Sequence, residues 1–180
     1  MRKGFQRYLL TGLTAAICLV LPITAHAAPT ANINVTVTIQ NLSVTATGPI
    51  AFGVVTASSQ TVSTLSSTVT NDGNVNETYS LSLTDPAGWS AVTAAPGAEE
   101  YALLAVFNGA QPVAGDFNYA NHAMTTLPVS CSATQFAGTQ TGLSLAPTTV
   151  TTLWFRFDAP TSTTVTTQQT IVVTLTAAAG

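Results

Sequence analysis

The sequence has 180 residues and a formal net charge of −3, and only 6% of its residues are charged. After residue 27 a single basic residue, Arg156, remains against all seven acidic residues. Nucleic-acid binding needs a basic stripe that displaces counterions from phosphates, so this composition excludes it, and it excludes attraction to an anionic membrane surface as well.

Residues 1–27 are predicted to be a cleaved signal peptide. Basic residues near the start are followed by an apolar run over 9–23 and by Ala25-His26-Ala27, the small-x-small pattern that signal peptidase reads. A lipobox at Cys18 and a prepilin site at Gly4-Phe5 are weaker alternatives. We therefore expect a secreted, cell-surface protein that has no membrane span after cleavage.

Residues 28–40 are predicted to form an N-terminal, strand-like arm. Its apolar residues stand at alternate positions, as in a strand with one apolar face. They are Ile33, Val35, Val37 and Ile39. The next apolar residues, Leu42 and Val44, have the opposite parity, and a one-residue slip turns side chains to the other face of a sheet. This predicts a break at Gln40-Asn41, so that the arm is able to pair with a different strand from the one that the following segment pairs with.

Residues 41–180 are predicted to form one immunoglobulin-like β-sandwich, giving an all-β fold of about eight or nine strands. Short alternating segments separated by turn signals are expected at 50–55, 61–70 and 79–83. The segment 100–107 is apolar throughout, which indicates a strand covered on both faces.

The second half of the chain is predicted to contain a long irregular insertion at about 108–148, with order returning in two strands at 150–157 and 165–175. In the first of these, Leu153, Phe155 and Phe157 are expected to face the core. Trp154 and Arg156 would then point outward as a candidate surface contact.

The pattern "AFGVV…STVTNDGNVNETYSLSL…PAGW" over about 50–90 resembles bacterial and archaeal immunoglobulin-like modules of the ASPM-SPD-2-Hydin and NEW3 kinds. This resemblance implies the fold and no single activity. The overall layout is similar to that of exported donor-strand filament subunits, namely the TasA/camelysin group and archaeal bundling pili. That second resemblance implies that the terminal strand of one subunit completes the sheet of the next.

Several other positions have residue types that are found in binding or modification sites. Asp72, Asn74 and Asn76 alternate as calcium ligands do, but Asp-Gly favours a β-hairpin turn and the EF-hand glycine and glutamate positions do not match. Cys131 is the only cysteine after residue 27, so no intramolecular disulfide is possible there; it is expected to be buried, with pairing between chains as the alternative. Candidate N-glycosylation positions are Asn34, Asn41 and Asn76.

No catalytic motif is present, so we expect neither an enzyme nor a cofactor or metal requirement. The leading hypothesis is a structural subunit of an extracellular filament or surface layer. The arm, through Ile33, Val35, Val37 and Ile39, would enter a second copy of the chain. The alternative is a monomeric exported module that binds carbohydrate or an envelope protein through its loops.

Overall fold

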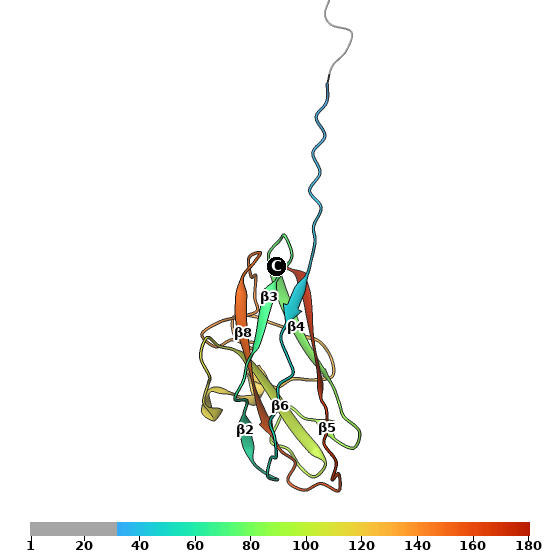
Figure 1. The fold of residues 1–180 in the computed structure, drawn as a ribbon, viewed down its shortest axis with the longest axis vertical. Coiled ribbons are helices and arrows are strands. Elements are labelled where there is room, and N and C mark those ends of the chain that lie inside the picture. Colours follow the sequence, from blue (N-terminus) through green and yellow to red (C-terminus); the bar gives the residue numbers. More distant parts are fainter. Residues whose placement is uncertain (1–31) are drawn as a thin grey trace, which may run out of the picture. The chain divides into compact units, whose positions relative to one another are not determined.

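The computed structural model describes residues 32–180, so the predicted signal peptide and the first residues of the predicted arm lie outside the described part. The described residues divide into the segment 32–37 and a compact unit, Thr38–Gly180. The regular secondary structure of the compact unit is almost entirely β-strand, arranged in two sheets (Figure 1). The expectation of an all-β sandwich is confirmed, and the sheets contain nine strands within the described residues.

The larger sheet has the strand order β1-β3-β8-β6-β5. Its strands are β1 (Val44–Ala46), β3 (Ser67–Asn71), β8 (Val150–Asp158), β6 (Glu100–Phe107) and β5 (Ser90–Ala91). A further short strand, β2 (Gln60–Val62), pairs with the second half of β8, beyond the part of β8 that pairs with β3. The strands β2 and β3 therefore act as one interrupted strand along the same side of β8.

The smaller sheet has the order β7-β4-β9. Its strands are β7 (Val129–Ser130), β4 (Glu77–Thr84) and β9 (Val172–Ala179). β4 and β9 pair antiparallel over their whole length, from Glu77 opposite Ala179 to Thr84 opposite Val172. β7 occupies the other side of β4 but is only two residues long, so β9 is a long strand at the edge of a narrow sheet.

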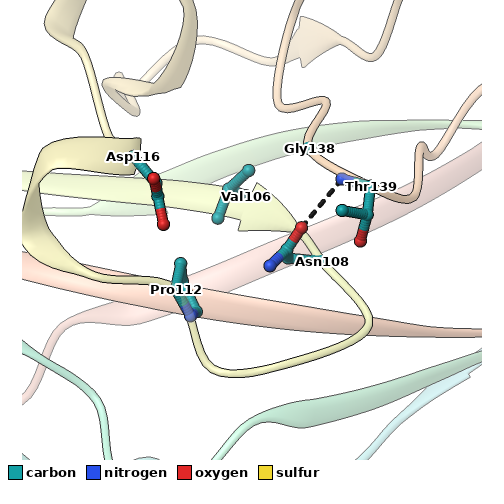
Figure 2. A pocket seen from close by; sticks show the side chains of 6 residues that line it. All are labelled: Val106, Asn108, Pro112, Asp116, Gly138 and Thr139. Atoms are coloured by element: carbon teal, nitrogen blue, oxygen red, sulfur yellow. Dashed lines mark hydrogen bonds between the residues drawn. The ribbon is translucent and has the colours of Figure 1, made fainter.

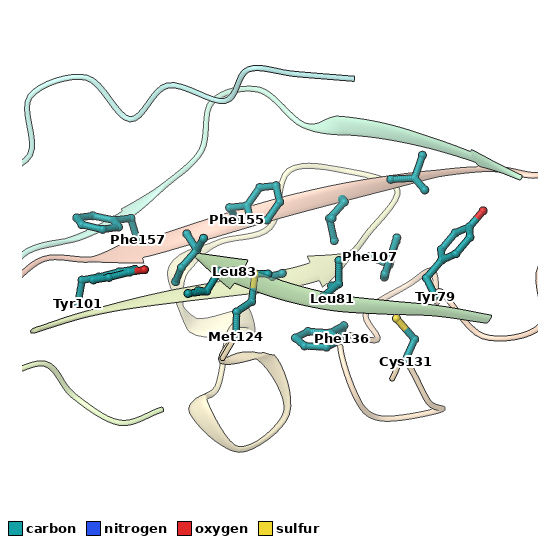
Figure 3. Packing of buried hydrophobic residues seen from close by; sticks show 14 of the residues in the cluster. Tyr79, Leu81, Leu83, Tyr101, Phe107, Met124, Cys131, Phe136, Phe155 and Phe157 are labelled. Atoms are coloured by element: carbon teal, nitrogen blue, oxygen red, sulfur yellow. The ribbon is translucent and has the colours of Figure 1, made fainter. Parts of the chain in front are cut away.

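The core lies between the two sheets, and Figure 3 shows its side chains converging from both. β4 contributes Tyr79, Leu81 and Leu83 at alternate positions, all at most 3% exposed, because successive side chains of a strand point to opposite faces. Trp154 of β8 packs on a second, smaller apolar cluster on the other face of the larger sheet. The prediction that β8 alternates and that 100–107 is covered on both faces is confirmed.

Three predicted strands differ from the observed ones. Residues 50–55 form no strand, and 61–70 is divided into β2 and β3 by a break in which Leu65 is 64% exposed. The last strand begins at Val172 rather than near residue 165 and continues through the alanines to Ala179. In each case short-range alternation was present, but pairing with a neighbour, which forms a strand, was missing or displaced.

The insertion at 108–148 is irregular, as predicted. Within it lie the 3-10 turn η1 (Ala114–Asp116), the single helical turn α1 (Tyr119–His122) and β7. The region 114–123 covers the outer face of β6, where Phe117 and Ala123 pack against Leu104 and Val106.

Candidate subunit-contact site

The predicted arm exposes its apolar side chains. The exposed fractions are 87% for Ile33, 87% for Val35, 85% for Val37 and 77% for Ile39. No residue from 32 to 43 belongs to a strand. These four β-branched side chains stand at alternate positions and form an apolar row that no residue from 32 to 180 buries. Side chains of this kind are usually buried in folded proteins.

The root of the arm is held by Asn74, which lies in the turn between β3 and β4. Its Oδ1 accepts the N–H of Asn41 at 2.8 Å, its Nδ2 donates to the carbonyl of Ile39 at 2.8 Å, and its own N–H donates to the Asn41 carbonyl at 3.1 Å. The asparagine side chain thus takes the place of a neighbouring strand's backbone. It holds residues 39–41 in one position at the end of the sandwich.

A buried carboxylate lies beneath this root. Glu77 has no exposed surface, and its Oε1 accepts the backbone N–H of Ser43 at 2.7 Å. Gly73 lies directly over the same group, because a Cβ at position 73 would overlap Glu77 Oε1 and the Asn41 carbonyl oxygen. The turn therefore needs glycine here so that Glu77 and the arm root can approach each other closely.

Residues 72–76 form a turn, as predicted, but this turn does not connect two paired strands of a hairpin. It carries the chain from β3 in the larger sheet to β4 in the smaller one, and these strands do not pair with each other. The alternating Asp72, Asn74 and Asn76 do not act together: Asn74 holds the arm root, and Asn76 donates to the Ser144 hydroxyl. Residues 32–180 contain no group of three or more His, Cys, Asp or Glu side chains placed to bind a metal.

The outer edge of β9 is the second part of the site. In the described chain β9 pairs with β4 alone, so every second residue points its N–H and C=O away from the sheet. Soluble proteins usually block such an edge with lysine, proline, a bulge or a short strand. β9 is eight residues long, its sequence is VVTLTAAA, and it contains none of these residues. The other edge strands, β1, β2, β5 and β7, have two or three residues each.

The core-facing side chains next to this edge are only half covered. Those of β9 are partly exposed, unlike their counterparts on β4, which are buried. The same holds for side chains on residues 44–55, which run from β1 toward β2. We call this set the β9 seam; its members are Val44, Ile50, Phe52, Val55, Ile171, Val173, Leu175 and Ala177.

The segment 48–55 does not pair with β9, so the outer edge of β9 has no strand partner in residues 32–180. The last ladder-like contacts after β1 are at Thr47, whose N–H donates to the Thr68 carbonyl and whose own carbonyl accepts the Ser67 hydroxyl. From residue 48 to 55 the backbone makes no hydrogen bond to other backbone groups of the described chain. This segment packs its apolar side chains on the core but supplies no strand to β9.

Arg156 is not a surface residue, and the expectation of an outward contact there is wrong. It is 4% exposed because the insertion covers it. Its guanidinium forms a bidentate ion pair with Asp158 at 2.9 Å. The same group donates hydrogen bonds to the backbone carbonyls of Ala114 and Phe117 in the insertion. Trp154 is partly buried and donates from Nε1 to the carbonyl of Asn108. Both side chains fix the insertion to β8.

Cys131 and His122 pack against different hydrophobic clusters. Cys131 is buried in the main core cluster, as expected, and burial raises the pKa of its thiol to about 12, which opposes formation of a nucleophilic thiolate. His122 packs edge-on against Phe117 of the second cluster, its Nδ1 accepts the Asn118 N–H, and burial lowers its pKa.

The insertion contains an open pocket of about 330 Å³, shown in Figure 2. Its polar side chains are already engaged: Asn108 accepts from the Thr139 N–H and donates to the Ala110 carbonyl, and Asp116 accepts from the Val113 N–H. Ligand sites usually present converging polar groups that are free to bind. The pocket therefore gives little support to a ligand-binding role for this insertion.

The three candidate glycosylation positions, Asn34, Asn41 and Asn76, are all exposed. Asn34 lies on the arm, between two residues of the apolar row. The backbone of Asn41 is part of the arm root, and the Asn76 side chain contacts Ser144. Modification at these sites stays a prediction.

No family model, curated protein or solved structure matches this chain. None of the helices within residues 32–180 has the length and apolar character needed to cross a membrane. The arm was identified by its alternation, but the β9 seam and the arm root were not found from sequence. The β9 alternation was visible, yet it carries no information on whether a strand is central or at an edge.

Proposed function

We propose that this chain is a secreted structural subunit that forms an extracellular filament or surface layer by donor-strand complementation. The arm of one immunoglobulin-like subunit enters the sheet of the next and has no enzymatic role. The observation that carries this proposal is the combination, in one chain, of an unpaired apolar arm and a long unguarded strand edge. The arm needs a strand to pair with and a surface that covers its apolar side chains, and the edge of β9 has unpaired backbone groups that can accept another strand.

Estimated free energies indicate that all four apolar side chains of the arm are needed for stable association. Burying one Val or Ile side chain contributes about 1.5–3 kcal/mol, so four contribute roughly 6–12 kcal/mol. Association of two proteins costs about 4–15 kcal/mol before any contact is counted. Side-chain burial alone is thus close to balance, and backbone pairing along an edge, at about 0.5–1.5 kcal/mol per hydrogen bond, supplies the excess.

The test is to delete residues 28–39 and to compare the purified proteins by sedimentation and negative-stain electron microscopy. The full mature chain is expected to form large assemblies, and the deletion variant to remain a folded monomer. Unchanged filaments from the deletion variant would remove the arm from the mechanism. A full-length mature chain that stays monomeric at high concentration would refute the polymerisation proposal itself.

A matched pair of variants separates apolar contact from arm length. Replacing Val35 and Val37 with serine removes half of the apolar row and is expected to abolish assembly at micromolar concentration. Replacing the interleaved Asn34 and Thr36 with serine leaves the row intact, and these chains are expected to assemble as the parent does. Equal loss of assembly in both variants would contradict a one-faced arm.

A further inference from the structure

We propose that the acceptor for the arm is the β9 seam of a second copy, and that the arm pairs antiparallel to β9 with Ile39 opposite Ile171 and Ile33 opposite Ala177. This inference rests on the proposed function and specifies its partner surface. It makes the smaller sheet four strands wide, in the order β7-β4-β9-arm.

The occupant of the seam is identified by its pattern. A strand added to the edge of β9 places its side chains alternately toward the core and toward solvent. On β9 the core-facing side chains of Val173, Leu175 and Ala177 stand at alternate positions and are half-buried, and the apolar side chains of the arm likewise stand at alternate positions and are exposed. Residues 32–39 and β9 have the same length, and neither contains a charged residue that would be desolvated on pairing.

The direction follows from where the arm is rooted. Asn74 holds residues 39–41 at the end of the sandwich where β3 passes to β4. β9 finishes at that same end, since Ala179 pairs with Glu77 and the Gly180 N–H donates to the Asn76 carbonyl. The arm therefore starts at the C-terminal end of its own seam.

Subunits stacked head to tail in one orientation bring this end of one copy against the opposite end of the next. The arm then enters the neighbouring seam at Ile171 and proceeds toward Ala177. Since the chain runs from Ile33 to Ile39, its direction is opposite to that of β9. Antiparallel pairing keeps core-facing residues directly opposite each other. The intermediate pairs are then Val37 with Val173 and Val35 with Leu175.

The ends of this register differ in side-chain size. Ala177, one of the two alanines on the core-facing side of β9, is opposite Ile33 of the arm. At the other end, the Ile39 backbone is held in its own subunit by Asn74 while its side chain stays 77% exposed. That side chain lies at the junction between the two copies, where it meets Ile171.

Engineered disulfides test both the seam and the direction in the mature full-length chain. A chain carrying Val35→Cys and Leu175→Cys is expected to give a ladder of covalent multimers on a non-reducing gel after mild oxidation, because directly opposed residues satisfy disulfide geometry. The matched control carries Val35→Cys and Thr174→Cys. Position 174 faces the other side of β9, so at least a tenfold weaker ladder is expected. Native Cys131 is buried and stays reduced.

For direction, Ile33→Cys with Ala177→Cys reports antiparallel pairing and Ile33→Cys with Ile171→Cys reports parallel pairing. A ladder from the second pair alone would overturn the direction. A cross-linked monomer would show that the arm fills its own seam. Equal ladders from Leu175→Cys and Thr174→Cys would overturn the register.

A charge in the seam gives an independent measurement. Val173→Asp is expected to abolish assembly, while Thr174→Asp, on the outer face of the same strand, is expected to leave it unchanged, with circular dichroism and thermal melting confirming that both chains fold. If the parent assembles through its arm but Val173→Asp chains assemble normally, the seam is wrong and the proposed function stands. If the parent never assembles, both are wrong.

Discussion

The backbone N–H of Ser43 donates a 2.7 Å hydrogen bond to Oε1 of Glu77, a carboxylate with no exposed surface. The two residues are 34 positions apart, and their contact joins the first residues after the arm to the start of β4. No basic side chain accompanies this buried acid, because the single cation of residues 32–180 lies in another cluster with Asp158. The Oε2 atom of Glu77 is buried with no hydrogen-bond partner among the described residues, so the Ser43 N–H is the one donor that the structure gives this side chain.

Glu77→Ala is expected to lower the free energy of unfolding by about 1–3 kcal/mol, since it leaves the Ser43 N–H without a partner. Glu77→Gln retains a carbonyl oxygen and is expected to lose less. Urea denaturation measures both. Asp72→Ala, at an exposed acid of the same turn, serves as the control and is expected to change stability by less than about 0.5 kcal/mol. Equal losses for Glu77 and Asp72 would contradict the assigned contact.

Asn74→Ala is expected to free the arm root without unfolding the sandwich. The side chain makes two of the three hydrogen bonds that hold residues 39–41, so amide hydrogen exchange over 39–43 should become faster while the core strands stay protected. Hydrogen exchange read by mass spectrometry or NMR gives the result. Asn76→Ala removes a contact with Ser144 and not with the arm, so it should leave exchange at 39–43 unchanged.

Arg156→Met is expected to destabilise the fold by about 3–5 kcal/mol, because it leaves the carboxylate of Asp158 buried without its cation. Adding Asp158→Leu removes that unpaired charge, so the double variant should recover part of the loss. Chemical denaturation of the two variants makes the comparison. A double variant less stable than Arg156→Met would show that the carboxylate is stabilised mainly by Tyr119 and Gln60, which also donate to it.

Two buried tyrosines should respond differently to loss of the hydroxyl group. The Tyr79 hydroxyl is buried without a hydrogen-bond partner, so Tyr79→Phe is expected to leave stability unchanged or raise it by up to about 1 kcal/mol. The Tyr101 hydroxyl donates to Asp85 at 2.8 Å, so Tyr101→Phe is expected to lower stability by about 1–2 kcal/mol. The reverse order in thermal or chemical unfolding would contradict these assignments.

Stability should fall at alkaline pH. Burial raises the pKa of Tyr79 and of Cys131 to about 12, and burial together with the hydrogen bond to Asp85 raises that of Tyr101. The unfolded chain therefore loses these protons first, beginning near pH 9. Stability is fully present below that pH and declines as pH rises toward 12. Unfolding free energies at pH 8 and pH 11 measure the decline, and a Cys131→Ala/Tyr79→Phe chain should show a smaller one.

The sequence predicted those features that depend on local alternation. The apolar parity of 33–39, the two faces of β8 and the covered strand 100–107 all follow from period-two burial. The irregular character of 108–148 was predicted from the absence of that pattern. Burial of Cys131 was the favoured prediction because a lone cysteine has no intramolecular disulfide partner and a free thiol behaves as a small apolar side chain.

Features that depend on tertiary pairing were missed. Residues 50–55 have the composition of a strand but no partner strand, and β9 begins seven residues later than its alternation suggested. Arg156 points to the face of β8 opposite Phe155 and Phe157, as its alternation predicted. That face is covered by the insertion, so the side chain is buried and not exposed to solvent. Glu77 lies at a core-facing position of β4, and its burial depends on the Ser43 N–H, which is distant in the sequence. The edge of β9 has no signature in its own sequence, because edge position is a property of the neighbours.

The burial of Arg156 also determines how this chain meets proteases. Lysine is absent after residue 27, and Arg156 is the one remaining arginine. Its side chain is 4% exposed and held by Asp158, so the only peptide bond in residues 32–180 that trypsin-like enzymes recognise is shielded in the folded state. The same composition leaves no lysine amine for cross-linking or acylation. Residues 32–180, once folded, are therefore expected to resist trypsin-like proteases, which cleave after lysine and arginine.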